Sequence, residues 1–299
     1  MALMLAALIG LLTQEMQKTK QVSTPQRDDA AAEKLGWKLS MQSWSLRRYT
    51  LFEAIDLTAK LGLRYIEIYP GQLMSKENRT PAGHEMSAQD LESVKAKLAQ
   101  AGIRAVAYGV VDLSADEEEC RKVFDFAKAL TIEQINSEPP AEAFDTVAKL
   151  VGEYGIKVGI HNHPKPSRYW SPERVQEVIA GRSSAIGFCA DTGHWVRSSL
   201  DPIAVLKANA GRIIGFHLKE LNEYGNVQAH DVPWGSGHQK MRGILEEMRR
   251  QNFRGVCSIE YEHDTAALLD DIARCIAFFD ATAKELASSE PEEKKEAGS

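Results

Sequence analysis

The chain has 299 residues, of which 43% are hydrophobic and 26% are charged, and its formal net charge is −6 at pH 7. This composition is ordinary for a globular enzyme with a large core. The negative balance argues against a protein that holds nucleic acid through a general positive field, so we expect no nucleic-acid partner. The length fits either two domains or one barrel of about 250 residues.

The first 36 residues do not share the pattern of the rest. Residues 2–12, ALMLAALIGLL, form an apolar run that is too short to span a membrane as a helix and is typical of a secretory signal. No basic residue precedes this run and no A-x-A site follows it, so an uncleaved anchor or a misplaced start codon is the alternative. Residues 13–36 are polar and predict a linker. The run favours export to the periplasm over a cytoplasmic location, and we expect no stable membrane domain.

Between residues 37 and 287, strand-like and helix-like segments alternate, as expected for parallel strands joined by helical crossovers. The joints LGLRY, AGIRA, YGIKV and NFRGV place a glycine at or near the point where a helix ends, and there it adopts a left-handed cap conformation without steric cost. The strands are predicted at 39–44, 64–69, 103–108, 131–136, 156–161, 185–190, 213–218 and 255–260, and examples of helices at 51–61, 87–100, 116–129, 141–153, 238–251 and 265–286.

Eight such units predict a single (β/α)8 barrel of the α/β class over residues 37–287. A doubly wound open sheet is the alternative. It would place a glycine-rich phosphate loop after the first strand, where the sequence reads QSWSLRR, so the barrel is favoured. Residues 288–299 form a charged tail of low complexity, which predicts disorder. No pair of cysteines has CxxC spacing, and three or four buried thiols are expected rather than a disulfide frame, among Cys120, Cys189, Cys257 and Cys275.

Histidines gather where the predicted strands end, which is where barrel enzymes have their active sites. Carboxylates and imidazoles that converge in one cup need a counter-charge, because unpaired buried acids are costly. A divalent cation with mixed oxygen and nitrogen ligands is the simplest answer, and we expect one ion of Mn, Co, Zn or Mg. Six of the eight histidines lie at these positions: His161, His163, His194, His217, His230 and His263.

The other side chains at the strand ends are candidates for substrate binding, and several have a plainer alternative. Trp195 and Trp234 form either a platform for the apolar face of a sugar or simple packing. Lys219 alternates with His217 and so faces inward, where it contacts substrate or pairs with Glu260 or Glu262. If Glu262 contacts neither Lys219 nor substrate, it is simply a charged residue at the rim of the barrel. The predicted substrate-binding set is Glu67, His194, Trp195, His230, Trp234 and Glu262.

Four motifs follow one another at consecutive strand ends: CADTGHW, GFHLKE, HDVPWGSG and SIEYE. In this order they resemble the sugar phosphate isomerase/epimerase superfamily, the xylose isomerase-like TIM barrels, over about residues 37–287. The resemblance implies a small-molecule sugar substrate, and it assigns metal binding to Asp191, His217 and Glu260. The fourth ligand of the family is a glutamate on the fifth strand, where this chain has His161. Either His161 binds through nitrogen, or Glu138 from the fourth strand supplies the missing carboxylate.

The resemblance also implies catalytic roles. The dehydratase branch of the superfamily uses a histidine two residues after the fifth-strand ligand for proton transfer, and His163 occupies that position. It follows that His163 acts as base or acid, Lys219 as a charge stabiliser, and Glu260 as a ligand with proton duty.

The step common to the superfamily is proton abstraction next to a carbonyl. We therefore expect a metal-dependent sugar isomerase or epimerase that acts through an enediolate. The alternative is a metal-dependent lyase or dehydratase on a keto-sugar or 3-keto-glycoside, similar to the inosose dehydratases. The AP endonucleases share DTGH, but they need histidines near strands two and three, where this chain reads YIEIYP and AVAYGVV. A non-catalytic sugar-binding barrel is a further alternative, and a homo-oligomer is compatible with the pattern.

Overall fold

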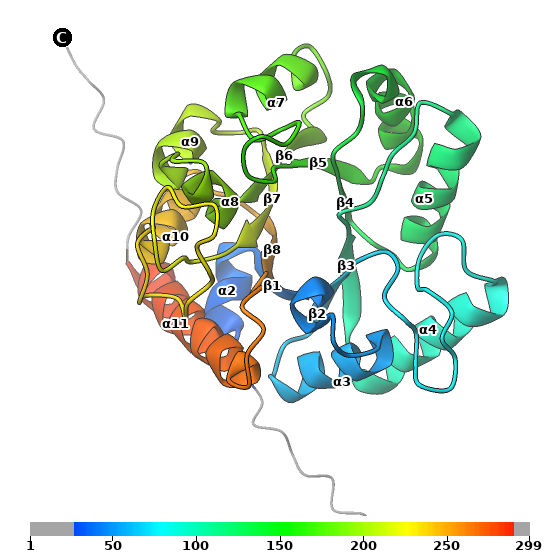
Figure 1. Ribbon diagram of the computed structural model, residues 1–299, viewed down its shortest axis with the longest axis horizontal. Coiled ribbons are helices and arrows are strands. Elements are labelled where there is room, and N and C mark those ends of the chain that lie inside the picture. The colour runs from blue at the N-terminus through cyan, green and yellow to red at the C-terminus, as the bar shows by residue number, and fades with distance from the viewer. Residues whose placement is uncertain (1–26, 290–299) are drawn as a thin grey trace, which may run out of the picture.

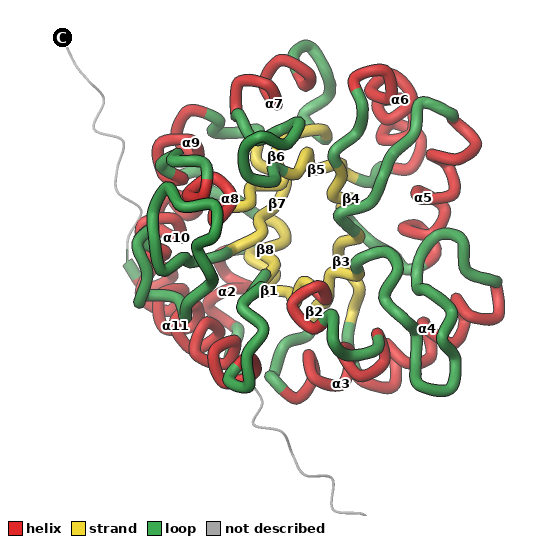
Figure 2. The backbone as a smooth tube through the Cα atoms, viewed as in Figure 1, coloured by secondary structure: helices red, strands yellow, loops and turns green. Residues whose placement is uncertain are grey.

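The structure is a computed structural model that describes residues 27–289. Eight parallel strands form a closed barrel, in which each strand pairs with the next along the chain and the last pairs with the first. Figures 1 and 2 look into this barrel, with the strands at the centre and the helices around them. The predicted (β/α)8 barrel is therefore confirmed. The strands are β1 (Trp37–Gln42), β2 (Tyr65–Ile68), β3 (Arg104–Tyr108), β4 (Gln134–Ser137), β5 (Lys157–His161), β6 (Ile186–Asp191), β7 (Ile213–Leu218) and β8 (Gly255–Ile259).

Helices cover the outside of the barrel, and each one named from the sequence overlaps an observed helix. The helices are α2 (Ala30–Leu35), α3 (Leu51–Lys60), α4 (Ala88–Ala101), α5 (Glu117–Ala129), α6 (Phe144–Tyr154), α7 (Pro172–Ile179), α8 (Thr192–Arg197), α9 (Pro202–Ala208), α10 (Met241–Arg250) and α11 (Leu268–Ser288), with 3-10 turns η1 (Ser43–Leu46) and η2 (Ala141–Ala143).

The chemistry of the helix-to-strand joints is confirmed at three of the four predicted places and differs at the fourth. Gly102 and Gly155 end α4 and α6 in the left-handed conformation, each with a φ of 67°, and Gly62 has a φ of 79°. In the joint NFRGV it is Asn252 that takes this conformation, with a φ of 51°. Gly255 is instead the first residue of β8, where an added Cβ would lie 2.8 Å from the Phe253 ring. Asparagine tolerates positive φ better than most residues, which leaves the glycine free for this close approach.

Part of the predicted linker is a helix that belongs to the barrel. Figure 1 shows α2 beside α11. Arg27 Nη2 lies 2.5 Å from Asp280 Oδ1, and Lys34 Nζ donates to the carbonyl oxygen of Ala287 at 2.7 Å. The predicted apolar signal or anchor segment and nearly all of the predicted tail lie outside the described residues. Within residues 27–289, none of the helices has the length and apolar character needed to cross a membrane.

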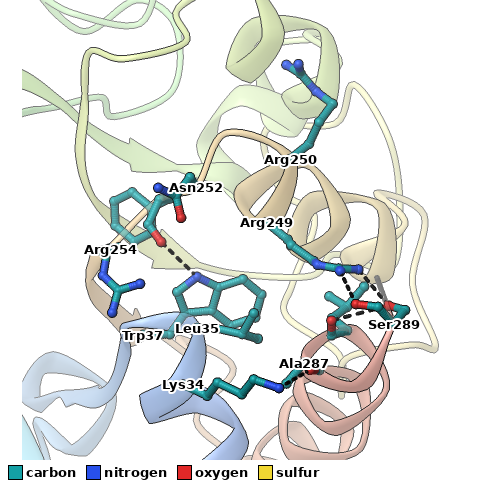
Figure 3. A pocket seen from close by; sticks show the side chains of 11 residues that line it. Lys34, Leu35, Trp37, Arg249, Arg250, Asn252, Arg254, Ala287 and Ser289 are labelled. Carbon is teal, nitrogen blue, oxygen red and sulfur yellow. Dashed lines mark hydrogen bonds between the residues drawn. The ribbon is translucent and has the colours of Figure 1, made fainter. Parts of the chain in front are cut away.

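A cavity of about 450 Å³ lies at the end of the barrel where the strands begin. Its floor includes Trp37 and Phe253, and its rim carries Lys34, Arg249 and Arg254 (Figure 3). None of the side chains predicted to bind metal or substrate lines it. The chemistry expected from the sequence therefore belongs to the opposite end, where the strands finish, which is called the barrel mouth below.

Candidate active site

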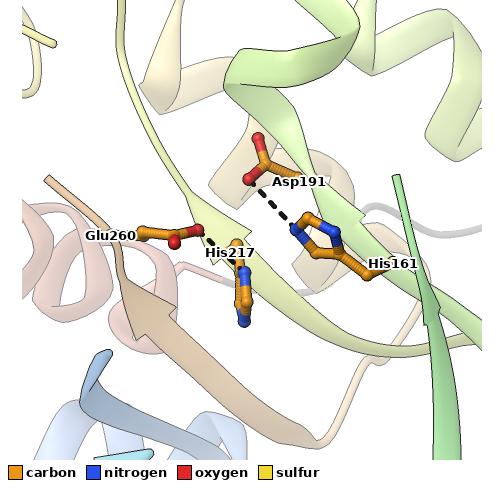
Figure 4. Close-up of side chains that lie close together, drawn as sticks. All are labelled: His161, Asp191, His217 and Glu260. Atoms are coloured by element: carbon orange, nitrogen blue, oxygen red, sulfur yellow. Dashed lines mark ion pairs between the residues drawn. The ribbon is translucent and has the colours of Figure 1, made fainter. Parts of the chain in front are cut away.

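Four side chains converge at the barrel mouth, each from a different strand end (Figure 4). His161 and Asp191 are the last residues of β5 and β6, His217 lies near the end of β7, and Glu260 follows β8. The strand register brings them to one level, because Asp191 pairs with His217 across β6 and β7. One ligand atom from each of the four lies within 4.8 Å of the others, and all four side chains are buried.

The atoms that face one another in this group form one buried polar cluster. His161 Nε2, Asp191 Oδ2, His217 Nδ1 and Glu260 Oε2 are buried, and none has a hydrogen bond of good geometry to another described residue, although His217 Nδ1 lies 2.8 Å from Glu260 Oε2 as an ion pair. A buried polar atom without a hydrogen bond costs roughly 1–3 kcal/mol, and among the described residues Lys219 is the one ammonium group that compensates the two carboxylates. Two carboxylates and two imidazoles are a donor set that zinc and related divalent ions accept. The residues present therefore fit a divalent cation, and they are called the candidate metal set below.

The outer nitrogen of His217 is held by Glu67. His217 Nε2 lies 2.9 Å from Glu67 Oε1, and the same carboxylate accepts hydrogen bonds from Asn136 Nδ2 at 2.7 Å and Ser258 Oγ at 2.5 Å. Glu67 is fully buried beneath the candidate metal set. In this position it orients the imidazole so that Nδ1 faces the other ligand atoms, and the predicted contact of Glu67 with substrate stays a prediction. A carboxylate behind a ligating histidine is a common arrangement in metal sites.

Glu138 holds the outer nitrogen of His161 in a similar way. Its Oε1 lies 3.1 Å from His161 Nδ1, which leaves Nε2 facing Asp191 Oδ2 at 3.5 Å. Of the two alternatives for the fourth ligand, the geometry favours His161 as the ligand and Glu138 as the group that orients it. Glu138 also belongs to a second cluster of metal-binding residue types, with His161 and His163.

His163 is exposed and forms a close pair with Glu138. Its Nδ1 lies 2.5 Å from Glu138 Oε1, and its backbone N–H donates to the same oxygen at 3.1 Å. Burial alone would raise the pKa of Glu138, but hydrogen bonds from His161 and His163 hold that pKa at about 2. The carboxylate is thus anionic at neutral pH and can accept a hydrogen bond from the His163 ring. This His163–Glu138 dyad has the form of a general acid–base pair.

Lys219 is fully buried, and its ammonium group lies among three carboxylates. Nζ is 3.0 Å from Asp191 Oδ2, and 3.1 Å from both Glu260 Oε2 and Glu262 Oε2. Burial would lower the pKa of Lys219, but these anions raise it above its usual value, so the lysine stays charged. Lys219 faces inward as predicted, and of its two predicted contacts the structure contains the salt bridges.

His194 is buried beside Asp191. Its Nδ1 is 2.9 Å from Arg197 Nη1, and its Nε2 is 3.2 Å from Lys219 Nζ. Burial and these two cations hold the pKa of His194 well below its usual value. The imidazole is therefore neutral, and both of its ring nitrogens face groups that can only donate hydrogen bonds. Its Nε2 also lies 3.6 Å from Asp191 Oδ2, so His194 adjoins the candidate metal set, and its contact with substrate stays a prediction.

Neither predicted tryptophan of the sugar platform faces the barrel mouth. Trp195 is fully buried and packs against Phe188 at a ring distance of 6.5 Å, and Trp234 packs against Phe279 at 6.4 Å. Both belong to the hydrophobic core, so the structure supports the packing alternative. The cause is local, because α8 begins directly after β6 and turns Trp195 away from the opening.

The remaining predicted substrate-binding residues lie at the rim. Glu262 is partly buried and accepts a hydrogen bond from Arg197 Nη1 at 2.9 Å. His230 is exposed and lies against His263, with ring centroids 4.2 Å apart. Neither histidine joins the candidate metal set. The sequence interpretation also missed the exposed Trp44 of η1, whose only signal was an aromatic residue at the end of the first predicted strand.

Comparisons with known proteins place this geometry in a family. Residues 55–282 match the family model described as xylose isomerase-like TIM barrel. Inosose dehydratase from Glaesserella parasuis serovar 5 (strain SH0165) is 26% identical over 143 residues, which are 42% of this chain and 48% of that protein. The chain therefore spans about half the length of that curated relative.

Solved structures match over most of the chain. A crystal structure of an uncharacterised protein from Parabacteroides distasonis ATCC 8503 is 31% identical, with a TM-score of 0.67 over 82% of this chain and 98% of that one. The crystal structure of the IolI protein with a bound zinc atom is 17% identical, with a TM-score of 0.63 over 84% of this chain and 100% of that one, a likeness of fold. Because the family model covers most of the chain and the barrel closes as that family requires, the protein belongs to the xylose isomerase-like TIM barrel family.

Proposed function

We propose that this protein is a divalent-metal-dependent lyase that acts on a keto-sugar. It eliminates a leaving group from the carbon β to the carbonyl. The observation that carries the proposal is the His163–Glu138 dyad. The dyad lies at the exposed edge of the candidate metal set, and His163 is not one of the four residues of that set. His163 can therefore exchange protons with the substrate without giving up a bond to the metal. The name of the curated relative, inosose dehydratase, supports the same reaction class.

The dyad can carry out both proton transfers of such an elimination. His163 takes the proton from the carbon next to the carbonyl, and the electron pair of that C–H bond becomes the new double bond. The C–O bond to the leaving group breaks with its electron pair on oxygen, and His163 returns the proton to that oxygen. Glu138 stabilises the imidazolium between the two transfers. The products are an unsaturated keto-sugar and water or an alcohol, without any oxidant or reductant.

The residues of the candidate metal set would hold a divalent cation through His161, Asp191, His217 and Glu260. When bound, the cation would polarise the substrate carbonyl and stabilise the negative charge that develops on its oxygen. The IolI structure, which has the same fold and a bound zinc atom, supports the presence of a metal. The neighbouring histidines and Lys219 keep Asp191 and Glu260 ionised, because against the effect of burial they hold the pKa values of both carboxylates below the usual range.

The test combines metal analysis with product analysis. The purified protein should contain about one divalent ion per chain, and Asp191→Asn and Glu260→Gln should lose it while keeping a folded barrel. Incubation with keto-sugars and keto-glycosides in deuterated water should release the leaving group, and His163→Gln should abolish that release while retaining the metal. Metal content unchanged in both ligand variants would overturn the metal site, and full release by His163→Gln would overturn the role of the dyad.

Isomerisation or epimerisation, which the sequence favoured, is the second candidate. The observation in its favour is that Glu260 approaches the candidate metal set from β8 while His163 approaches from β5, so two bases stand at different sides of one site. The same incubation separates the two reactions. Deuterium incorporation into the sugar without release of water or alcohol would identify an isomerase or epimerase.

A further inference from the structure

An exposed tryptophan stands at the barrel mouth and is held in one orientation. Trp44 is 40% exposed and is one of three large hydrophobic side chains exposed among residues 27–289. Its ring meets Tyr69 edge to face, with centroids 5.1 Å apart and an interplanar angle of 89°, and the Arg47 guanidinium lies 5.4 Å from its centroid. An indole that is fixed by its neighbours and still open to solvent offers a ring surface on which the ring of a ligand can stack.

The turn that carries Trp44 is tied to the segment that carries Glu260. Ser45 Oγ donates to the carbonyl oxygen of Ile259 at 3.3 Å and accepts from the N–H of Tyr261 at 2.8 Å, so the two bonds flank Glu260. Figure 1 shows η1 as the blue turn beside β1 and β2, in front of the strands. Trp44 therefore belongs to the rim of the same site as the candidate metal set.

Tyr69 extends this surface from the neighbouring strand. Side chains alternate along a strand, so Tyr69, two residues after Glu67, leans to the same side but nearer the solvent. Its N–H donates to Ser43 Oγ at 3.0 Å, which joins it to η1, and its side chain is partly buried. Trp44 and Tyr69, called the aromatic wall below, thus lie one layer outside the Glu67–His217 pair.

We propose that the aromatic wall binds a ring on the leaving group, which makes the substrate a keto-glycoside with a ring aglycone rather than a free keto-sugar. This proposal rests on the proposed function, because the reacting sugar must occupy the candidate metal set. The next ring of a glycoside would then lie one layer outward, at the level of the wall. The C–H face of a pyranose and the face of an aryl group both stack on an indole, so both classes of aglycone share the chemistry.

The test compares aglycones of different size on one keto-sugar: methyl, glucosyl and 4-nitrophenyl 3-keto-glucosides. Trp44→Ala should raise KM for the two ring aglycones about tenfold, with kcat within about threefold, and should leave the methyl glycoside within about twofold of wild type. Trp44→Phe should restore most of the affinity. Tyr224→Ala is the matched control, because Tyr224 is 48% exposed and lies outside the wall. The larger of the two ring effects identifies the class of aglycone.

Two outcomes would overturn the wall: equal effects of Trp44→Ala on all three substrates, or no effect on any. Calorimetric binding of the same glucosides without the ketone separates this proposal from the proposed function. If wild type releases no aglycone, the proposed lyase activity is wrong. The binding role of the aromatic wall is still supported in that case if a ring glucoside binds wild type about tenfold more tightly than it binds Trp44→Ala. If ring and methyl glucosides bind wild type equally while aglycone is released, the binding role of the aromatic wall is wrong and the proposed lyase activity is supported.

Discussion

At the scale of single residues, the site is defined by what stands behind each ligand. Glu67 and Glu138 each take the outer nitrogen of one imidazole, and this fixes which ring nitrogen faces the centre. The sequence placed both glutamates at strand ends but could not tell a residue that faces substrate from one that lies beneath a ligand. That difference depends on depth within the barrel, which strand periodicity does not encode.

Lys219 is the residue whose removal should most clearly expose the charge balance of the site. In Lys219→Met, the carboxylates of Asp191 and Glu260 lose a buried cation that lies about 3 Å away. We expect the free energy of unfolding in the presence of a chelator to fall by about 3–5 kcal/mol, because removing one partner strands a buried charge. Excess divalent ion should recover most of this loss, since its charge compensates the same carboxylates.

Urea denaturation with chelator and with added zinc or manganese measures both values. Lys284→Met, an exposed lysine on α11, is the control and should change neither. A loss of stability that is identical with and without the metal would show that Lys219 does not share its carboxylates with the cation.

Elements were predicted from the sequence more securely than the orientation of side chains at their ends. All eight strands were found because each apolar run is bounded by glycine or polar residues, although β4 begins at Gln134 rather than 131. The shift has a local cause, because Thr131 takes a left-handed conformation with a φ of 57° and so cannot continue a strand. The helix α8 was missed, since its sequence TGHWVR follows β6 without a spacer, and with it the inward turn of Trp195.

The segment between β7 and α10 is organised by one buried carboxylate. Glu220 accepts a hydrogen bond from the backbone N–H group of Gly235, and the backbone N–H groups of Gly237 and Met241 also favour its ionised form. In Glu220→Ala these N–H groups lose the carboxylate that they face. We therefore expect backbone amide exchange over residues 233–241 to become at least tenfold faster, which corresponds to a decrease of about 1.4 kcal/mol in the free energy of local opening. Hydrogen exchange with mass spectrometry measures this.

Glu223→Ala is the matched control for that experiment, because Glu223 is exposed in the same segment and accepts only from the Asn226 side chain among the described residues. Equal exchange rates in the Glu220→Ala variant and in wild type would mean that the segment is held by its other contacts, such as the hydrogen bond from its Gln239 to the carbonyl oxygen of Lys219.

At the scale of the whole molecule, the packing of helices against the barrel keeps all four cysteines away from solvent. Each is a free, buried thiol. Burial raises the pKa of Cys120 and Cys189 to about 11 and that of Cys275 to about 12, and it raises the pKa of Cys257 as well. A raised pKa lowers the thiolate fraction at any given pH, and the thiolate is the reactive form.

We therefore expect no rapid reaction of the native protein with a thiol-specific chromogenic reagent at pH 8, and reaction of all four cysteines once the protein is unfolded in guanidinium. Absorbance of the released chromophore measures both. One or more thiols that react immediately in the native protein would show that part of the barrel opens to solvent.

Asp191 unites two properties that are often separate in enzymes. As the residue that ends β6 and caps α8, it accepts the N–H of His194 at 2.7 Å through Oδ1, while Oδ2 faces the candidate metal set. One oxygen thus serves the architecture and the other serves the chemistry. For protein engineering, this makes position 191 one to preserve: a designer who wants an inert barrel as a scaffold should keep Asp191 and remove the metal-binding groups elsewhere, at Glu260 or His217.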